Sequence, residues 1–274
     1  QGRRVLLAIE EAGPAPGLLL GMVLGAEPAE LAPNLQVVQF QSAVLLEKNW
    51  DELKQMEAQY LRTPFFKEVY GQELGVLPGM DSALTLNAIR EYDASGKYDV
   101  IVFDGRGDQA SLRMLGMPEI AGWYVRRFRK VFADSDLGKT LSPFIQPITS
   151  AVLNVGWTDD IFNQPMAQQA NNMLEQGRQA IADPNRVAAY LVTTADETAV
   201  ATAKYLWGAA QQVGLTVGGV ILNRMHEANG LTQEFAPLPL FPVPNQPVND
   251  WQVLMDALPS FDQASQAPKP IAIN

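Results

Sequence analysis

The chain has 274 residues, a formal net charge of −10 and a sequence pI near 4.6, and it is long enough for one large α/β domain. The acidic balance argues against a nucleic-acid-binding protein, which needs a basic face to replace phosphate counterions. Because there is no Cys and His226 is the single His, disulfides, thiolate zinc sites and histidine-rich metal clusters are excluded.

No apolar run approaches the roughly 20 residues that a membrane-spanning helix needs. The apolar residues 17–26 cover half that length, and we predict that they form a buried turn and helix. No secretory signal opens the chain. These features predict a protein that is not integral to the membrane and that lies in the cytoplasm, or in the stroma if it comes from a plastid.

The first part of the chain predicts strands and helices in alternation. Residues 4–9 and 35–40 are predicted strands, and the second is placed nearer the sheet edge because its apolar and polar residues alternate. Residues 42–60 have helical spacing. A further helix is predicted from Asp81, after a Pro-Gly pair, to Tyr92.

The central feature of the sequence is a strand that ends in a carboxylate. Residues 100–103 are continuously apolar, as in a strand buried on both faces of a parallel sheet, and Asp104 follows them. Gly105 and Gly107 then make a flexible turn. These are the elements of a Walker B strand with a switch loop, whose Asp holds the water shell of a nucleotide-bound Mg²⁺. The alternative is that Asp104 only caps the turn.

Strand patterns are absent from residue 112 to about residue 182, which predicts a helical insert. Beyond the insert the alternation of strands and helices resumes. The predicted strands there are residues 187–193, 217–223 and 238–243, and the predicted helices are residues 196–213 and 250–258.

This order of elements predicts an α/β fold with a mainly parallel sheet flanked by helices. We assign residues 1–110 and 183–260 to the α/β core and residues 111–182 to the helical insert. Residues 261–274, which are rich in Gln, Ser and Pro, are a predicted linker to a possible further domain.

Four short motifs follow one another in an order that resembles a known family. A Pro-Gly-x-Asp motif precedes a predicted helix, the apolar strand that ends in Asp104 comes next, and a Leu-Arg-x-Leu motif and a Pro-Glu pair follow the turn. The four motifs are residues 78–81, 98–104, 112–115 and 118–119. The chain resembles the ATPases that drive arsenical pumps and target tail-anchored membrane proteins, which are deviant-Walker P-loop NTPases. The resemblance is dense over residues 77–119 and weaker but collinear from Arg4 to about Asp256.

The resemblance implies a switch protein that binds and hydrolyses ATP with Mg²⁺. Glu11 falls on the position of the Asp that polarises the attacking water, although its carboxylate reaches one methylene further. Asp104 would contact Mg²⁺ through a water molecule, and no residue of this chain would bind the metal directly. The strand end at Asn223 and Arg224, together with Pro242, would contact the adenine base. The alternatives are a solvated strand end at Glu11 and a turn-capping role for Asn223.

The helical insert would bind a hydrophobic client or partner, such as a helix of a membrane protein or a membrane pump subunit. The resemblance also implies that the insert is paired across a homodimer. The residues predicted to make this surface are Met114, Met117, Val125, Phe128 and Phe132. The alternative is that these residues pack the insert against the sheet.

The phosphate-binding element of the family has no counterpart in this chain. Gly138-Lys139-Thr140 ends like a Walker A motif, but Ala133 replaces its first glycine and no strand precedes it. The resemblance places the first strand and the P-loop before Arg4. We therefore expect a chain truncated at both ends and inactive without that P-loop. The alternative function is a non-catalytic, chaperone-like binding module that keeps the NTPase fold.

Overall fold

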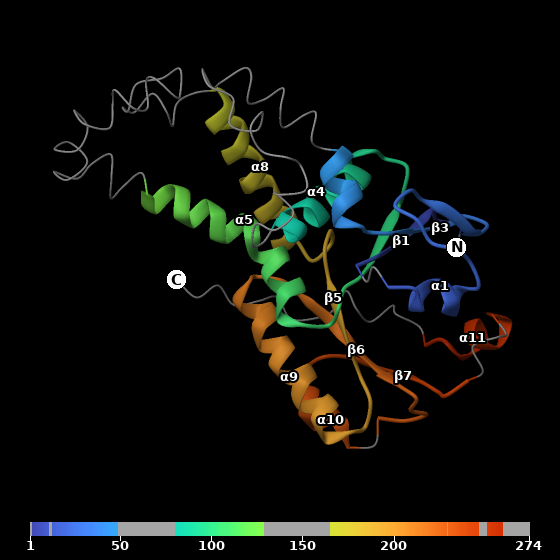
Figure 1. The fold of residues 1–274 in the computed structure, drawn as a ribbon. Helices are drawn as coiled ribbons and strands as arrows, with labels where there is room; N and C mark the ends of the chain where they lie inside the picture. The colour runs from blue at the N-terminus through green and yellow to red at the C-terminus, as the bar shows by residue number, and fades with distance from the viewer. Residues whose placement is uncertain are drawn as a thin grey trace, which may run out of the picture. The chain divides into compact units, whose positions relative to one another are not determined.

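The computed structural model describes residues 2–10, 13–48, 80–128, 165–228, 230–246 and 251–259 (Figure 1). Glu11 and Phe132, like Gly138-Lys139-Thr140, lie outside these residues. The chain forms two compact units. The first comprises Gln1–Gly107 and Ile120–Asn172, and the second comprises Asp108–Glu119 and Met173–Asn274.

The sheet of the first unit has four strands in the order β2-β3-β1-β4. Its strands are β1 (Val5–Ile9), β2 (Ala29–Ala32), β3 (Leu35–Gln39) and β4 (Val100–Asp104). β1 pairs in parallel with both β3 and β4. β2 was not predicted; it pairs antiparallel with β3 and forms the edge of the described sheet, so β3 lies one strand in from that edge. A turn at Asn34, with φ of 63°, joins β2 to β3.

The core of the first unit lies on one face of this sheet. Alternate strand residues point to it, as the pleat requires, and they meet α4 (Met80–Ala94) and the helix at residues 42–48. The buried residues of this core are Leu6, Ala8, Val38, Phe40, Leu45, Leu46, Leu84 and Ala88.

The predicted burial of residues 17–26 is wrong. Helix α1 (Ala15–Leu20) ends at Gly21, whose φ of 69° stops the helix after six residues. Leu18, Leu19 and Val23 are exposed. A helix this short does not offer a long apolar stripe to pack against the sheet.

A pair of charged residues joins the amino ends of β1 and β4 in the first unit. The backbone N–H of Arg4 donates to Asp99 Oδ2 at 2.8 Å, and Arg4 Nη2 donates to Asp99 Oδ1 at 2.7 Å. We call this pair the Arg4–Asp99 clamp. It fixes the chain immediately before both strands begin.

The sheet of the second unit has three parallel strands in the order β5-β6-β7. They are β5 (Ala189–Thr193), β6 (Val217–Asn223) and β7 (Leu240–Val243). β5 and β6 are joined by α9 (Glu197–Gln212), whose N-cap Asp196 accepts hydrogen bonds from the N–H groups of Thr198 and Ala199. Gly219 lets the Phe241 ring approach the backbone of β6.

The core of the second unit includes residues from β5, β6 and α9 and from the short helix α10 (Leu231–Phe235). Its most completely buried members are Ala210, Leu215, Val220, Leu222 and Phe235.

Long helices occupy the described parts of the predicted insert. These helices are α5 (Gln109–Phe128) and α8 (Pro165–Ala182). A further short helix, α11 (Trp251–Ala257), lies outside the insert, near the end of the described residues. Asp108 caps α5, because its Oδ1 accepts from the Ser111 N–H at 3.0 Å. Among the described helices, none has the length and hydropathy that crossing a membrane requires.

Parallel strands flanked by helices confirm the predicted α/β fold. The assignment of residues 111–182 to a separate insert remains a prediction.

Candidate active site

In the first unit, three strands end together at the carboxyl edge of the sheet. Ile9 is paired in register with Asp104 on β4 and with Gln39 on β3. The Glu10 N–H donates to the Asp104 carbonyl oxygen at 3.0 Å, and the Phe40 N–H donates to the Ile9 carbonyl oxygen at 2.9 Å. The loops that follow β1, β3 and β4 therefore start from one rigid edge, where open α/β sheets bind their ligands.

Asp104 is an exposed residue at this edge. Two positions back, Val102 lies on the same face, whereas Ile101 and Phe103 pack against the core on the other face. The turn after Asp104 contains Gly107, whose φ of 67° is a conformation that favours glycine. The structure thus places an exposed carboxylate, followed by a turn that contains a glycine with positive φ, at the carboxyl end of β4.

The loop after β4 is held by Glu10, a residue that the sequence did not single out as a ligand. The Arg106 backbone N–H donates to Glu10 Oε2 at 3.1 Å, and Arg106 Nε lies 3.8 Å from Glu10 Oε1. The Glu10 side chain is only 13% exposed, and a carboxylate with so little access to water needs a partner such as Arg106 to compensate its charge. The Glu10–Arg106 pair thus connects the end of β1 to the turn after Asp104.

A second missed residue, Gln39, supports the loop after β1. It is 5% exposed, and its Nε2 donates to the Gly13 carbonyl oxygen at 2.7 Å. A buried amide needs such a partner. The signal that could have found Gln39 is a polar residue at the carboxyl end of an otherwise apolar strand, the same signal that pointed to Asp104.

In the second unit, the structure brings together the three residues predicted to contact a base. Pro242 is paired with Leu222, the residue before Asn223, and the Met225 N–H donates to the Val243 carbonyl oxygen at 3.0 Å.

Asn223 and Arg224 are exposed at this edge, and Arg224 turns the chain with φ of 61°. Pro242 is half-buried. These three residues therefore lie at the carboxyl ends of β6 and β7, whereas Asp104 belongs to the first unit.

The residues predicted to make a client surface have different environments. Met114 is 1% exposed, so in this structure it is an interior residue and does not face a client. Met117 is half-buried, and Val125 and Phe128 lie in the last part of α5. Phe132 lies outside the described residues.

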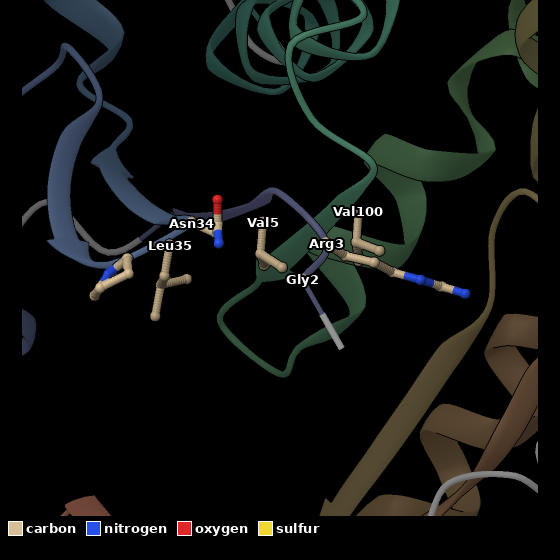
Figure 2. A pocket seen from close by; sticks show the side chains of 7 residues that line it. Gly2, Arg3, Val5, Asn34, Leu35 and Val100 are labelled. Atoms are coloured by element: carbon tan, nitrogen blue, oxygen red, sulfur yellow. The ribbon is translucent and has the colours of Figure 1, made fainter.

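A hollow of about 510 Å³ lies at the opposite end of the first sheet (Figure 2). Figure 2 shows Val5, Leu35 and Val100 lining it, and these residues are paired across β1, β3 and β4 near the amino ends of the strands. Because α/β sheets bind ligands at the carboxyl ends of their strands, this hollow is not where a nucleotide is expected. In the described ranges, no group of three or more His, Asp or Glu side chains could hold a metal ion.

Parallel strands flanked by helices, with a carboxylate at one strand end, are consistent with a P-loop NTPase-like α/β fold. The chain belongs to the anion-transporting ATPase family, because the family model matches residues 6–235. This confirms the family predicted from the motifs.

The chain is similar to two bacterial proteins with the same name, "Putative arsenical pump-driving ATPase". The protein of Chlorobaculum tepidum is 24% identical over 213 residues, which is 75% of this chain and 50% of that protein. The protein of Prosthecochloris vibrioformis is 23% identical over 235 residues, which is 83% of this chain and 55% of that protein. This chain therefore spans about half the length of the curated relatives that it matches.

Proposed function

We propose that this chain is the part of an ATPase that places a carboxylate beside the hydrated Mg²⁺ of bound ATP. The position of Asp104 carries this proposal. Asp104 is exposed at the carboxyl end of β4, and its backbone is fixed by the Glu10 N–H at 3.0 Å. Membership of the anion-transporting ATPase family supports ATP and Mg²⁺ as the ligands.

Each unit, considered by itself, offers groups that suit one part of a nucleotide. In the first unit the Asp104 carboxylate can accept hydrogen bonds from metal-bound water, and in the second unit the Asn223 amide offers both the donor and the acceptors that an adenine edge requires. Mg²⁺ would neutralise charge on the phosphates. We propose that the backbone cradle and the lysine that hold those phosphates come from another part of the full-length polypeptide.

Replacing Asp104 with Asn in the full-length protein tests the proposal. We expect kcat for ATP hydrolysis to fall by at least about tenfold, while ATP affinity changes by less than about threefold, because the carboxylate acts most strongly in the transition state. Steady-state kinetics and equilibrium nucleotide binding measure the two quantities. Asp99→Asn is the matched control, since Asp99 stands at the amino end of the same strand and should leave kcat unchanged.

Two results would contradict this role for Asp104. Equal losses of binding and turnover would indicate a structural carboxylate. A full-length protein that binds ATP without turning it over would favour the alternative, a binding module that keeps the NTPase fold without catalysis.

We also propose an apolar partner surface on α5, for a hydrophobic helix of a membrane protein or pump subunit, presented by a homodimer. Two exposed apolar side chains of α5, Ile120 and Trp123, support this proposal, because they lie about one helical turn apart on the same face. The Trp123 side chain is 51% exposed. Replacing both with Ser should weaken capture of an apolar helical peptide by about tenfold without changing the melting temperature.

Leu18→Ser is the control for this experiment, because Leu18 is an exposed leucine of α1. Unchanged capture with the double Ser variant, or a sharp loss of stability, would contradict the surface.

A further inference from the structure

The loop that follows β1 in the first unit is apolar and faces water. It spans residues 13–26, includes α1 (Figure 1), and consists only of Gly, Pro, Ala, Leu, Met and Val. We call it the apolar loop. The most exposed large apolar side chains of the described residues all belong to it: Leu18 at 80%, Leu19 at 72% and Val23 at 94%. Single exposed apolar residues are ordinary, but such a group marks a surface that interacts with something.

Both ends of the apolar loop are fixed to one residue of β3. Gln39 Nε2 donates to the Gly13 carbonyl oxygen at 2.7 Å, and the Gln39 backbone N–H donates to the Gly25 carbonyl oxygen at 2.9 Å. Gln39 is buried and is paired in register with Ile9 of β1. The loop therefore leaves the sheet and returns to it at one point, as compact surface loops of this length do.

The middle of the apolar loop is closed by its own backbone. The Met22 N–H donates to the Gly17 carbonyl oxygen at 3.0 Å. A Cβ at Gly17 would lie 2.8 Å from the Met22 carbonyl oxygen, so this approach requires glycine. Gly21, with φ of 69°, ends α1 between the two exposed leucines and the exposed valine. The three side chains are thus held by a closed backbone, which lowers the entropic cost of binding through them.

The composition of the apolar loop favours a lipid partner over a protein partner. A protein interface has a polar rim and about one hydrogen bond per 100–200 Å². The side chains of the loop offer no such bond beyond the weak thioether acceptor of Met22. A second copy also lacks area here, because each partner of a stable complex contributes about 20–30 residues and roughly 800 Å². The hydrocarbon of a lipid bilayer needs no hydrogen bond from what it contacts.

The backbone of the apolar loop also suits contact with lipid. A segment that enters hydrocarbon must satisfy its backbone polar groups internally. The Leu18 N–H donates to the Pro14 carbonyl oxygen at 3.1 Å, and the Met22 N–H is bonded to Gly17. Pro14 and Pro16 have no N–H to satisfy. Several donors of the loop are therefore paired or missing before any partner binds.

We propose that the apolar loop is a membrane-contact site, which inserts Leu18, Leu19 and Val23 at the boundary between head groups and acyl chains of a zwitterionic bilayer. Glu27 and Glu30, just beyond the loop, are exposed, and the chain carries a net charge of −10, so anionic head groups would repel this surface. The contact is peripheral and reversible. It requires neither ATP nor the partner surface on α5, so it can fail separately from the proposed function.

Co-sedimentation with phosphatidylcholine vesicles, without nucleotide, tests the proposal in this chain and in the full-length protein. Replacing the three exposed side chains of the loop together with Ser should lower the vesicle partition coefficient at least about tenfold, because their apolar surface then stays in water. The melting temperature should change by less than about 2 °C, since these side chains are exposed. Val192→Ser, at an exposed valine of β5, is the matched control and should bind vesicles as the wild type does.

A fluorescent label gives a second readout, because this chain has no Cys of its own. An environment-sensitive dye on Val23→Cys should shift its emission to shorter wavelength when the vesicles are added, and it should become shielded from iodide. The same dye on Tyr205→Cys, at an exposed position of α9, should show neither change. Replacing part of the phosphatidylcholine with phosphatidylglycerol should weaken binding at low salt.

Four results would overturn the inference. Equal vesicle binding by the wild type and the triple Ser variant, or no binding by either, would show that the loop does not contact lipid. Binding by this chain but not by the full-length protein would mean that the rest of the polypeptide covers the loop. A sharp fall in the melting temperature of the triple variant would make the loop part of the packing. Preference for anionic vesicles would assign the binding to basic side chains elsewhere.

Discussion

At the residue scale, the Glu10 carboxylate accepts from the Arg106 backbone N–H, and that contact fixes the turn that follows Asp104. Hydrogen bonds to charged groups contribute about 1.5–3 kcal/mol. Glu10 is therefore a positioning residue that acts through the β4 turn.

We expect Glu10→Gln to lower kcat of the full-length ATPase by about three- to tenfold and to change KM little, because a neutral amide holds Arg106 less firmly. Glu10→Gln combined with Arg106→Gln should lower kcat no further than the larger single effect, since each replacement removes the same Glu10–Arg106 ion pair and neither removes the Arg106 backbone N–H. Steady-state kinetics of the two single variants and the double variant provides the measurement. Glu30→Gln, on the far edge strand β2, is the control.

Additive losses in the double variant would show that Glu10 and Arg106 act independently of each other.

The sequence could single out Asp104 as a candidate site residue, but not the side chains that surround it. Asp104 follows a continuous apolar run, which is a local signal. Glu10 and Arg106 are 96 residues apart, and they meet only because β1 and β4 pair in the register that sets Ile9 beside Asp104. A side-chain contact of this kind depends on strand order, which local patterns do not encode.

At the element scale, the Arg4–Asp99 clamp joins β1 to β4 at their amino ends. The side-chain hydrogen bonds from Arg4 lower the pKa of Asp99 to about 2. An Asp of the unfolded chain titrates near pH 4. Because the folded state holds this carboxylate ionised, the clamp stabilises the fold at neutral pH and loses its contribution as pH falls from about 4 to about 2.

We expect Asp99→Asn to reduce the free energy of unfolding of this chain at pH 6, and the difference from the wild type to vanish as pH falls toward 2. Urea unfolding at several pH values measures the difference, which cancels the titration of the other carboxylates. Glu30→Gln, in the same sheet, should show no such pH-dependent difference. A stability difference of the same size at pH 6 and pH 2 would contradict the role of the charge.

The elements that the sequence predicted best are the apolar strands. β6 has the predicted bounds, Val217–Asn223, and β4 extends by one residue to include Asp104. β2 was missed because Ala-Glu-Leu-Ala lacks the β-branched and aromatic residues typical of strands; it forms through its pairing with β3. α10 was missed because a five-residue helix is too short to show a periodic pattern.

At the scale of the whole molecule, the acidic charge and the available site residues both bear on nucleotide affinity. The net charge of −10 opposes a polyphosphate ligand unless a cation or a lysine compensates it. The described residues offer Asp104, Asn223 and Arg224, but they contain no glycine-rich loop that ends in Gly-Lys-Ser or Gly-Lys-Thr, the usual cradle for phosphates.

We expect this chain alone to bind Mg·ATP with a Kd weaker than about 100 µM, compared with low micromolar binding by the full-length protein. Isothermal titration calorimetry on both proteins checks the prediction, with Mg·ADP as the matched ligand. Micromolar affinity of this chain for Mg·ATP would show that it contains its own phosphate site.

Family and fold class were predictable because they depend on many positions at once. The motifs at residues 78–81 and 98–104 each carry a small amount of information, and their order along the chain adds to it. The environment of Met114 was not predictable, since an apolar helix position can be interior or exposed, and only packing decides. The division into an α/β core and an insert at residues 111–182 stays a prediction.

The position of β4 at the edge of its described sheet also matters for how the protein behaves in solution. In the part of the first unit that the structure describes, no strand pairs with the outer side of β4, and Val102 is 48% exposed, so this edge offers a pairing surface to an extended apolar chain nearby, which is how edge strands start aggregation. The mutual repulsion of molecules that each carry a charge of −10 opposes such encounters, and added salt weakens that repulsion. Charge repulsion therefore helps to keep the molecules dispersed at low ionic strength.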